Sequence, residues 1–232
     1  MDIILDGLKQ AFLLVARLDA EVLSVSFLTL QVTLTATAIS MVLGVAAGTA
    51  VALNEFPGRS LVVGLVNTGM GVPPVVVGLF TTILLWRNGL LGELELLYTP
   101  SAIVIAQVLI ATPMVTGITL SSIQQIPKSF RLQVLALGAS RLQMLWYLYR
   151  EARLPLLAAV MAGFGSVVSE VGAAIMVGGN IRGHTRVLTT ATVMETSRGN
   201  FDMAIALGVI LMVIAFSVNY ALSHLQQRSR QR

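Results

Sequence analysis

The chain has 232 residues, of which 56% are hydrophobic and 11% are charged, and its mean hydropathy is +0.84. A soluble domain of this length would hardly stay in solution with so little charge, so the composition indicates a membrane protein. The net charge of +4 does not indicate a nucleic-acid partner, because the basic residues gather in one loop and the tail, where they act mainly on membrane topology. The absence of cysteine excludes disulfides, thiolate metal sites and a cysteine nucleophile.

Residues 1–21 predict an interfacial helix or a plain N-terminal anchor. They lack the basic start and small-residue cleavage site of a signal peptide, and four acids oppose that interpretation. Apolar residues recur there at helical spacing, which favours a helix lying in the membrane interface before the first span. These residues are Ile4, Leu8, Ala11, Phe12 and Val15.

Five long apolar runs follow, and only one of them contains an acid. Each exceeds the roughly 20 residues that cross the hydrocarbon core as a helix. We therefore expect an all-α integral membrane protein of five transmembrane helices, with a transmembrane domain over 22–224 and a basic tail over 225–232. The predicted spans cover 22–54, 60–86, 96–127, 154–181 and 203–227.

The loop 126–154 decides the predicted orientation. It holds five Lys and Arg residues, more than any other loop between predicted spans, and basic loops stay in the cytoplasm. Five spans put the termini on opposite sides, so we expect a multi-pass protein of the plasma (inner) membrane with its N-terminus outside and its C-terminus in the cytoplasm. The tail RSRQR is then a topological signal.

Small residues and prolines mark the first three spans. Gly44 and Gly48 favour close helix packing. Pro73 and Pro74 in the second span and Pro113 in the third predict helix kinks, because proline removes a backbone donor and clashes with the preceding turn. These kinks are compatible with a permeation path lined by broken helices and with simple bundle packing.

Motifs of several enzyme classes are missing. The only lysines, Lys9 and Lys128, do not follow a glycine as a P-loop requires, and neither HExxH nor GxSxG occurs. We therefore assign no catalytic residue and no metal site, and expect the energy for any work to come from another subunit.

Glu170 is the one acid inside a predicted span. It lies about fifteen residues after Pro155, or roughly 23 Å along a helix. A buried acid costs several kcal/mol unless it is protonated, paired or facing water, which favours a functional role. An inter-helix hydrogen bond, with room provided by Gly163 and Ser166, is the alternative.

The segment after this span predicts an anion site on the outside. Paired glycines can aim backbone N–H groups into a concave nest, and nearby arginines supply positive charge. A flexible loop with solvated charges is the alternative. Residues 186–195 predict a short helix at the outer mouth. The candidates for an anion path or gate are Ser166, Ser169, Glu170, Gly178, Gly179, Asn180, Arg182, Thr185 and Arg186.

The loop 126–154 resembles the EAA loop of type I ABC-importer permeases. The resemblance rests on Ala136-Leu137-Gly138-Ala139, on Leu154-Pro155, and on Pro113 and Ile126-Pro127 before them. Leu132, Gln133 and Val134 stand where the family has Glu-Ala-Ala, and the segment between Gly138 and Leu154 is about one turn longer. The resemblance implies a cytoplasmic coupling helix that docks on an ATPase subunit through Arg131, Ala136, Leu137, Gly138, Ala139 and Ser140.

Ser169-Glu170-Val171-Gly172-Ala173 is similar to an element of molybdate, tungstate and sulfate permeases, and residues 150–153 and 178–201 are most similar to tungstate permeases. The resemblance implies tungstate import by a homodimer of this chain in membrane lipid. Its implied partners are a cytoplasmic ATPase dimer, which binds the ATP and Mg, and an extracytoplasmic oxyanion-binding protein. No cofactor is expected in this chain. We expect Glu170 to be protonated or bonded to backbone, since its charge would repel a dianion.

Three alternatives remain at this stage. The first is a permease for molybdate or sulfate. The second is a secondary transporter or channel acting alone. The third is a structural or assembly protein of the membrane, which agrees with the small number of ionisable residues inside the predicted spans.

Overall fold

A computed structural model describes residues 2–17 and 19–230 of the chain, and these residues form helices and connecting loops without strands. This arrangement confirms the predicted all-α fold class. The elements are α1 (Asp2–Ala16), α2 (Ala20–Leu53), α3 (Arg59–Met70), α4 (Pro74–Leu85), the 3-10 turn η1 (Gly92–Leu94), α5 (Pro100–Gln124), α6 (Lys128–Ala136), α7 (Arg141–Glu151), α8 (Arg153–Val168), α9 (Gly172–Gly178), α10 (Leu188–Ser197) and α11 (Phe201–Arg230).

Among the described residues, three helices are long and apolar enough to cross a membrane: α2, α5 and the part of α11 from Phe201 to His224. Two pairs of shorter helices are long and apolar enough to cross a membrane when each pair is taken together. These are α3 with α4, bent by 104°, and α7 with α8, bent by 71°. Counting each bent pair as one span gives five, the number expected from hydropathy. Hydropathy is averaged over a window of residues and does not report bends within it. The two bends are therefore seen only in the structure.

One predicted boundary was wrong. The fourth span was expected as one helix over 154–181, whereas α8 ends at Val168 and a separate helix, α9, follows from Gly172. The apolar part of α11 ends at His224, where the basic tail was predicted to begin, and the helix itself continues as far as Arg230. Gln231 and Arg232 lie outside the described residues, as do Met1 and Leu18 of the predicted N-terminal segment.

The core of the bundle is the contact between α2 and α5. An ideal Cβ atom placed on Gly48 would lie 2.6 Å from the carbonyl oxygen of Thr116, and one on Gly44 would lie 2.7 Å from the Cβ of Val115. Only glycine permits so close an approach of two helices, which is the packing face that the small residues of α2 predict. The hydroxyl of Thr33 donates to the carbonyl of Thr29 in the preceding turn at 2.7 Å, so that its polar group is satisfied within the helix.

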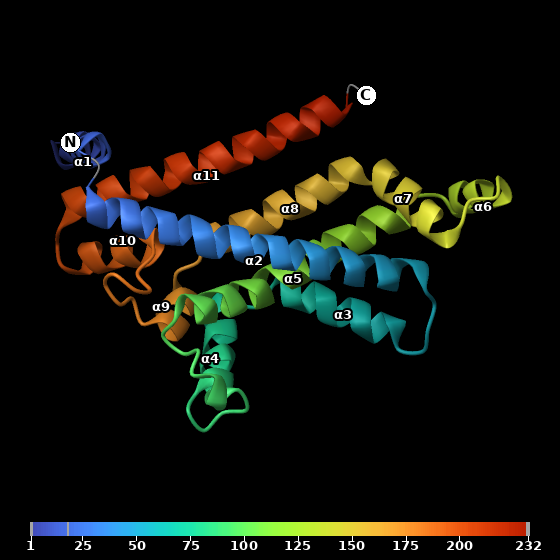
Figure 1. Cartoon of the computed structure of the whole chain (residues 1–232), viewed down its shortest axis with the longest axis horizontal. Coiled ribbons are helices and arrows are strands. Elements are labelled where there is room, and N and C mark those ends of the chain that lie inside the picture. Colours follow the sequence, from blue (N-terminus) through green and yellow to red (C-terminus); the bar gives the residue numbers. More distant parts are fainter. Residues whose placement is uncertain (1, 18, 231–232) are drawn as a thin grey trace.

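Helix α1 lies across the first part of α11 (Figure 1). Gly7 allows the contact, since a Cβ there would lie 2.5 Å from the side chain of Ile205, and Ala11 is buried. The other members of the predicted apolar stripe, Ile4, Leu8, Phe12 and Val15, remain exposed. An exposed apolar face suits a helix that lies in a membrane interface.

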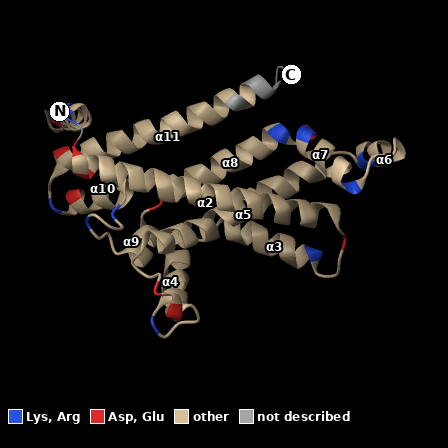
Figure 2. Cartoon of the chain, viewed as in Figure 1, with Lys and Arg blue, Asp and Glu red and all other residues tan. Residues whose placement is uncertain are grey.

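Helices α2, α5, α8 and α11 run along the long axis of the molecule, with α1 and α10 at one end and α6 and α7 at the other (Figure 1). Acids gather at the start of α2, in α10 and at the start of α11, while Lys and Arg mark the end formed by α6 and α7 (Figure 2). The two ends of the bundle therefore differ in charge.

Candidate functional site

The sequence Gly-Val-Pro-Pro separates α3 from α4. Gly71 ends α3 by donating its N–H to the carbonyl of Thr68 at 2.9 Å, and Pro73 is extended, with φ −58° and ψ 126°. A residue before proline is pushed out of the helical region, and here two prolines follow each other. Pro74 then starts α4 at the first helical position, where its missing donor costs nothing. A kink was expected here, and the structure has a full break of 104°.

A second break separates α8 from α9 around Glu170. The amides of Ser169 and Glu170 both donate to the carbonyl of Val167, which closes α8. Oε1 of Glu170 then accepts the N–H of Ala173 at 2.7 Å, in the first turn of α9. A carboxylate is favourable at a helix N-terminus because it satisfies a free donor there. The expected position of Glu170 deep inside one continuous helix was therefore wrong, while the expected bond to backbone is present.

Neighbouring helices hold this second break in place. Thr189 of α10 donates its hydroxyl to the carbonyl of Glu170 at 2.9 Å, and Gln107 of α5 donates Nε2 to the carbonyl of Val167 at 3.3 Å. Glu170 is only 8% exposed. Hydrogen bonds from two other helices thus hold the backbone on both sides of the break.

The two breaks face each other across one cavity of about 370 Å³. Close contacts between α4 and α9 bring them together, since a Cβ on Gly78 would lie 2.6 Å from Cα of Ala173. Ser166 and Ser169 face this cavity and donate their hydroxyls to carbonyls of α8 at 2.7 and 2.9 Å. The wall consists of Gly69, Met70, Gly71, Val72, Pro73, Pro74, Val77, Ile110, Met114, Ser166, Ser169 and Glu170.

This cavity unites two groups of residues that the sequence analysis treated separately, the prolines of the second span and the serines and acid of the fourth. Pro113 lies apart from the wall, within the uninterrupted helix α5, and faces α3, where a Cβ on Gly69 would lie 2.9 Å from its ring. The cavity offers hydroxyl oxygens, glycine backbone and one carboxylate that is already hydrogen-bonded. A wall of this kind offers hydrogen bonds to a polar solute, and none of its described residues has a positive side chain that would bind an anion strongly.

The other predicted anion residues lie at the end of α9 and in the loop between α9 and α10, and several of them bond within this segment or to α10. Thr185 donates its hydroxyl to the carbonyl of Gly178 at 2.5 Å and accepts the N–H of Ile181 at 2.9 Å. Thr190 donates to Oδ1 of Asn180 at 2.9 Å. Gly179 has φ +71° and packs against the ring of Tyr98, where a Cβ would come within 2.8 Å. The glycines therefore serve turns and packing in this conformation.

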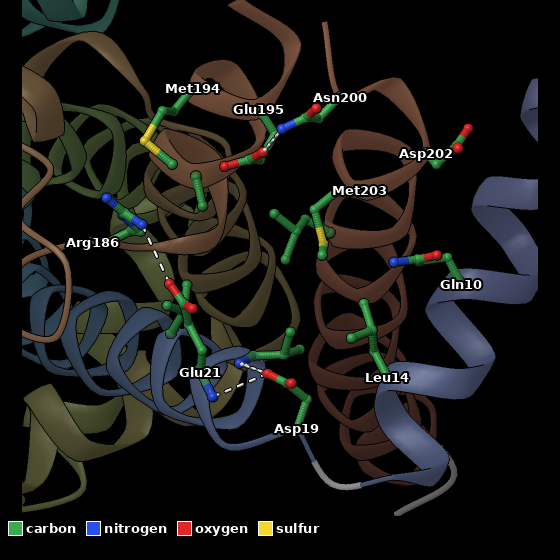
Figure 3. A pocket seen from close by; sticks show the side chains of 14 residues that line it. Gln10, Leu14, Asp19, Glu21, Arg186, Met194, Glu195, Asn200, Asp202 and Met203 are labelled. Carbon is green, nitrogen blue, oxygen red and sulfur yellow. Dashed lines mark hydrogen bonds and ion pairs between the residues drawn. The ribbon is translucent and has the colours of Figure 1, made fainter. Parts of the chain in front are cut away.

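Arg182 and Arg186 of the same loop both bond to Glu21, at the start of α2 (Figure 3 shows Arg186 and Glu21). Nε of Arg182 lies 2.8 Å from Oε1 of Glu21, and its Nη2 bonds to the other oxygen, while Nη1 of Arg186 lies 3.3 Å from Oε1. The hydrogen bond and the charge attraction raise the pKa of the Arg182 guanidinium above its ordinary value. Glu21 is 161 residues away in sequence, and the sequence analysis missed it because no local pattern connects it to the arginines.

A cavity of about 410 Å³ lies beside these ion pairs, between α1, α2, α10 and α11 (Figure 3). Arg186 is the one basic residue on its wall, against four acids. Asp19 caps α2 by accepting the amides of Glu21 and Val22, and Asn200 donates to Glu195 at 2.7 Å. The acids on this wall are Asp19, Glu21, Glu195 and Asp202. Their charge disfavours an oxyanion here.

Helices α6 and α7 form the predicted coupling loop. Gly138 has φ +86°, which glycine adopts without strain, and its amide closes α6 on the carbonyl of Leu135 at 3.0 Å. Ser140 starts α7 in a reciprocal capping box with Gln143. The turn between the two helices contains Leu137, Gly138 and Ala139 and meets no other part of the described chain at Gly138.

Apolar side chains on this loop are exposed. Leu137 is 88% exposed and Leu142 is 79% exposed. The base is anchored through Leu148 of α7 and Ala152, the residue between α7 and α8, which pack on Ile123 at the end of α5. Beside the loop runs a groove of about 960 Å³ whose wall includes Arg59, Lys128, Arg131 and Arg141. Exposed leucines beside a basic groove are typical of a protein-binding surface.

Comparison with known proteins identifies the chain. Residues 40–231 match the family described as binding-protein-dependent transport system inner membrane component. The chain belongs to this family. It is thus a membrane-embedded transport subunit, which confirms the resemblance derived from the loop and the prediction that the chain itself is not an enzyme.

The similarity to individual permeases extends over almost the whole chain. The Tungstate uptake system permease protein TupB of Peptoclostridium acidaminophilum is 38% identical over 98% of this chain and 100% of its own length. TupB of Campylobacter jejuni is 34% identical over 95% of this chain and 92% of its own. A solved structure of the methionine ABC transporter MetNI, in inward-facing conformations, superimposes with a TM-score of 0.69 at 19% identity, covering 88% of this chain and 93% of that one. The fold is that of type I ABC-importer permeases.

Proposed function

We propose that this chain is the permease subunit of an ATP-driven importer for tungstate. The observation that carries the proposal is the 38% identity to a tungstate uptake permease over the full length of that protein. Full-length similarity includes the loop that would contact an ATPase and the segment around Glu170, so that the whole transport unit is compared rather than one motif.

The path for the anion, in this proposal, passes the cavity between the two helix breaks. Ser166 and Ser169 supply hydroxyl groups, and Gly71 and the backbone beside it supply polar groups without bulk. The N–H of Ala173 bonds to one carboxylate oxygen of Glu170, so this oxygen is directed at the first turn of α9, and the partial positive charge of that helix end offsets part of the carboxylate charge. Weak binding in the path suits a transporter, since tight binding would hold the anion there.

The energy would come from a separate ATPase dimer docked on α6 and α7. The exposed Leu137 and Leu142 and the basic groove beside them support this contact. Arg131, Ala136, Leu137, Gly138, Ala139 and Ser140 remain the predicted contact residues, and all of them belong to α6, to the turn after it or to the cap of α7.

The remaining parts of the proposal concern assembly and orientation. Two copies of the chain would form the path in the plasma membrane. An extracytoplasmic binding protein would deliver tungstate at the end with α10. The opposite end, with α6 and α7, would face the cytoplasm. The concentration of Lys and Arg around α6 and α7 (Figure 2) supports this orientation.

Reconstitution in liposomes tests the function. The chain is combined with an ATPase subunit and a tungstate-binding protein from the same genome, and tungstate uptake and ATP hydrolysis are measured. We expect uptake that requires ATP and loaded binding protein. Uptake by the chain alone, without ATP or partner, would instead establish a secondary transporter or channel. Normal tungstate uptake by a strain lacking this gene and any substitute transporter would favour a structural protein.

A further inference from the structure

An apolar groove runs along the outside of the bundle between α2 and α8, with a volume of about 470 Å³. Its α2 wall consists of Met41, Val42, Val45 and Ala46. The groove lies apart from the cavity at the helix breaks, because none of its residues belongs to that wall.

The opposite wall has a polar end and an apolar end. Arg153 and Tyr149 lie at one end, and Leu156, Leu157 and Val160 continue along α8 from there. Arg153 is the first residue of α8, next to the α6–α7 end of the bundle, and Val160 is about 10 Å farther along the helix axis. The groove is therefore basic where the bundle meets the membrane surface and apolar where it extends into the span.

The charge of Arg153 is uncompensated within the described residues. No hydrogen bond or ion pair of its guanidinium is present there, although the side chain is half-buried. Arg150, one turn earlier, is different, since its guanidinium lies over the ring of Trp146 at 5.4 Å from the centroid. Trp146, Tyr147 and Tyr149 belong to the same turn region, and aromatic residues of this kind collect at the level of lipid headgroups.

We propose that this groove binds one anionic phospholipid, with its phosphate on Arg153 and one acyl chain against α2 and α8. A phospholipid is the occupant that has a negative group at the surface and an apolar chain beneath it. Basic sites between transmembrane helices bind anionic headgroups by this combination of charge and depth. The bound chain would link α8, which carries one side of the second helix break, to α2, which packs on α5.

Native mass spectrometry of the full-length chain in detergent tests the site. The protein is titrated with phosphatidylglycerol or phosphatidylcholine, and the lipid molecules retained per chain are counted. We expect one phosphatidylglycerol to be retained in preference to phosphatidylcholine. Arg153→Gln should weaken this retention about fivefold, the effect of one cation near an anionic surface, while Arg150→Gln should leave it unchanged.

A second pair of variants tests the apolar part. Val45→Trp fills the groove and should remove the retained lipid, whereas Leu43→Trp, exposed on α2 but not part of the groove wall, should not. Equal retention by Arg153→Gln and Arg150→Gln, or by both tryptophan variants, would overturn the proposal. A Val45→Trp variant that changes the oligomeric mass while lipid retention stays normal would show that a second copy of the chain covers the groove, and would also overturn it.

Discussion

The α6–α7 loop and the α9–α10 loop lie at opposite ends of the bundle (Figure 1) and are built from similar residues. Each contains a glycine with positive φ in open space, Gly138 at +86° and Gly183 at +73°, and each carries arginines. Their environments differ. The α9–α10 loop is bonded internally through Thr185 and Asn180, and its arginines are paired with Glu21, whereas the α6–α7 loop leaves Leu137 88% exposed.

This difference separates two kinds of loop that look alike in sequence. In the α9–α10 loop the polar groups and charges are largely satisfied within the chain, apart from the buried Nε of Arg186, so the loop has few free groups for a partner. A loop with exposed apolar side chains, such as the α6–α7 loop, is stabilised when those side chains are buried against another protein. We therefore propose that the α6–α7 loop serves coupling and that most of the α9–α10 loop has a stabilising role. The predictions below test that assignment, beginning with the largest effect.

The largest effect is expected for Gly138→Asp. Both Gly138 and Gly183 have positive φ, so aspartate at either position costs a similar backbone strain of about 1–2 kcal/mol. Only at Gly138 would the new charge enter the proposed ATPase contact. We expect Gly138→Asp to lower the stimulation of ATP hydrolysis by loaded binding protein at least about tenfold, the loss that corresponds to about 1.4 kcal/mol.

Gly183→Asp is the matched control for this variant. We expect it to insert in the membrane and to keep normal coupling in the same liposome assay. Equal loss of coupling in the two variants would show that strain, and not the position in the α6–α7 loop, is responsible.

The second prediction concerns Thr185, which is buried and bridges Gly178 and Ile181. Thr185→Val keeps the shape but leaves a buried carbonyl and a buried amide without their partner. We expect a loss of about 2–3 kcal/mol in the free energy of unfolding. Denaturation of the purified chain measures it, and a loss below about 0.5 kcal/mol would contradict the internal bonding of the loop.

Ser140 provides the corresponding test in the α6–α7 loop. Its capping box is exposed, so Ser140→Ala should cost only about 0.5–1 kcal/mol. We expect Thr185→Val to lose more stability than Ser140→Ala, and Gly138→Asp to lose more coupling than Gly183→Asp. If both comparisons come out the other way, the roles of the two loops have been interchanged.

The smallest effect is expected for Glu21→Gln. Arg182 and Arg186 would lose their shared carboxylate, and exposed ion pairs contribute little to stability. We expect faster hydrogen exchange of residues 181–187, measured by mass spectrometry, without loss of the fold. Glu93→Gln, on the exposed turn η1, is the control and should leave this exchange unchanged.

The same ion pair should not act as a pH switch through its arginine. A raised pKa in the folded state means that the stabilising contribution is complete below the unfolded pKa and is lost only as the pH rises through the folded value. Both values for Arg182 lie far above neutrality. Exchange of residues 181–187, corrected for the intrinsic rate, should therefore show no loss of this contribution between about pH 6 and pH 9.

Some features of the molecule follow from local pattern and composition. Membrane insertion and five apolar segments follow from hydropathy, since burial in lipid depends on the apolar character of each segment alone. The segment around Gly138 was located through its resemblance to a family motif, because that motif is contiguous in the chain. The turn at Gly138 and the cap at Ser140 were not predicted. The prolines indicated a disturbance near residue 73, since their effect on the backbone is local.

Other features arise from contacts between distant segments. The side chain of Glu170 accepts an N–H from the first turn of α9, and that role requires α8 to end at Val168, with Gln107 and Thr189 bonded to carbonyl groups at the break. The pairing of Arg182 and Arg186 with Glu21 joins positions more than 160 residues apart. A local pattern predicts that a residue is able to bind an anion. Whether its charge is already compensated depends on the packing of α2 against the α9–α10 loop, which no single segment encodes.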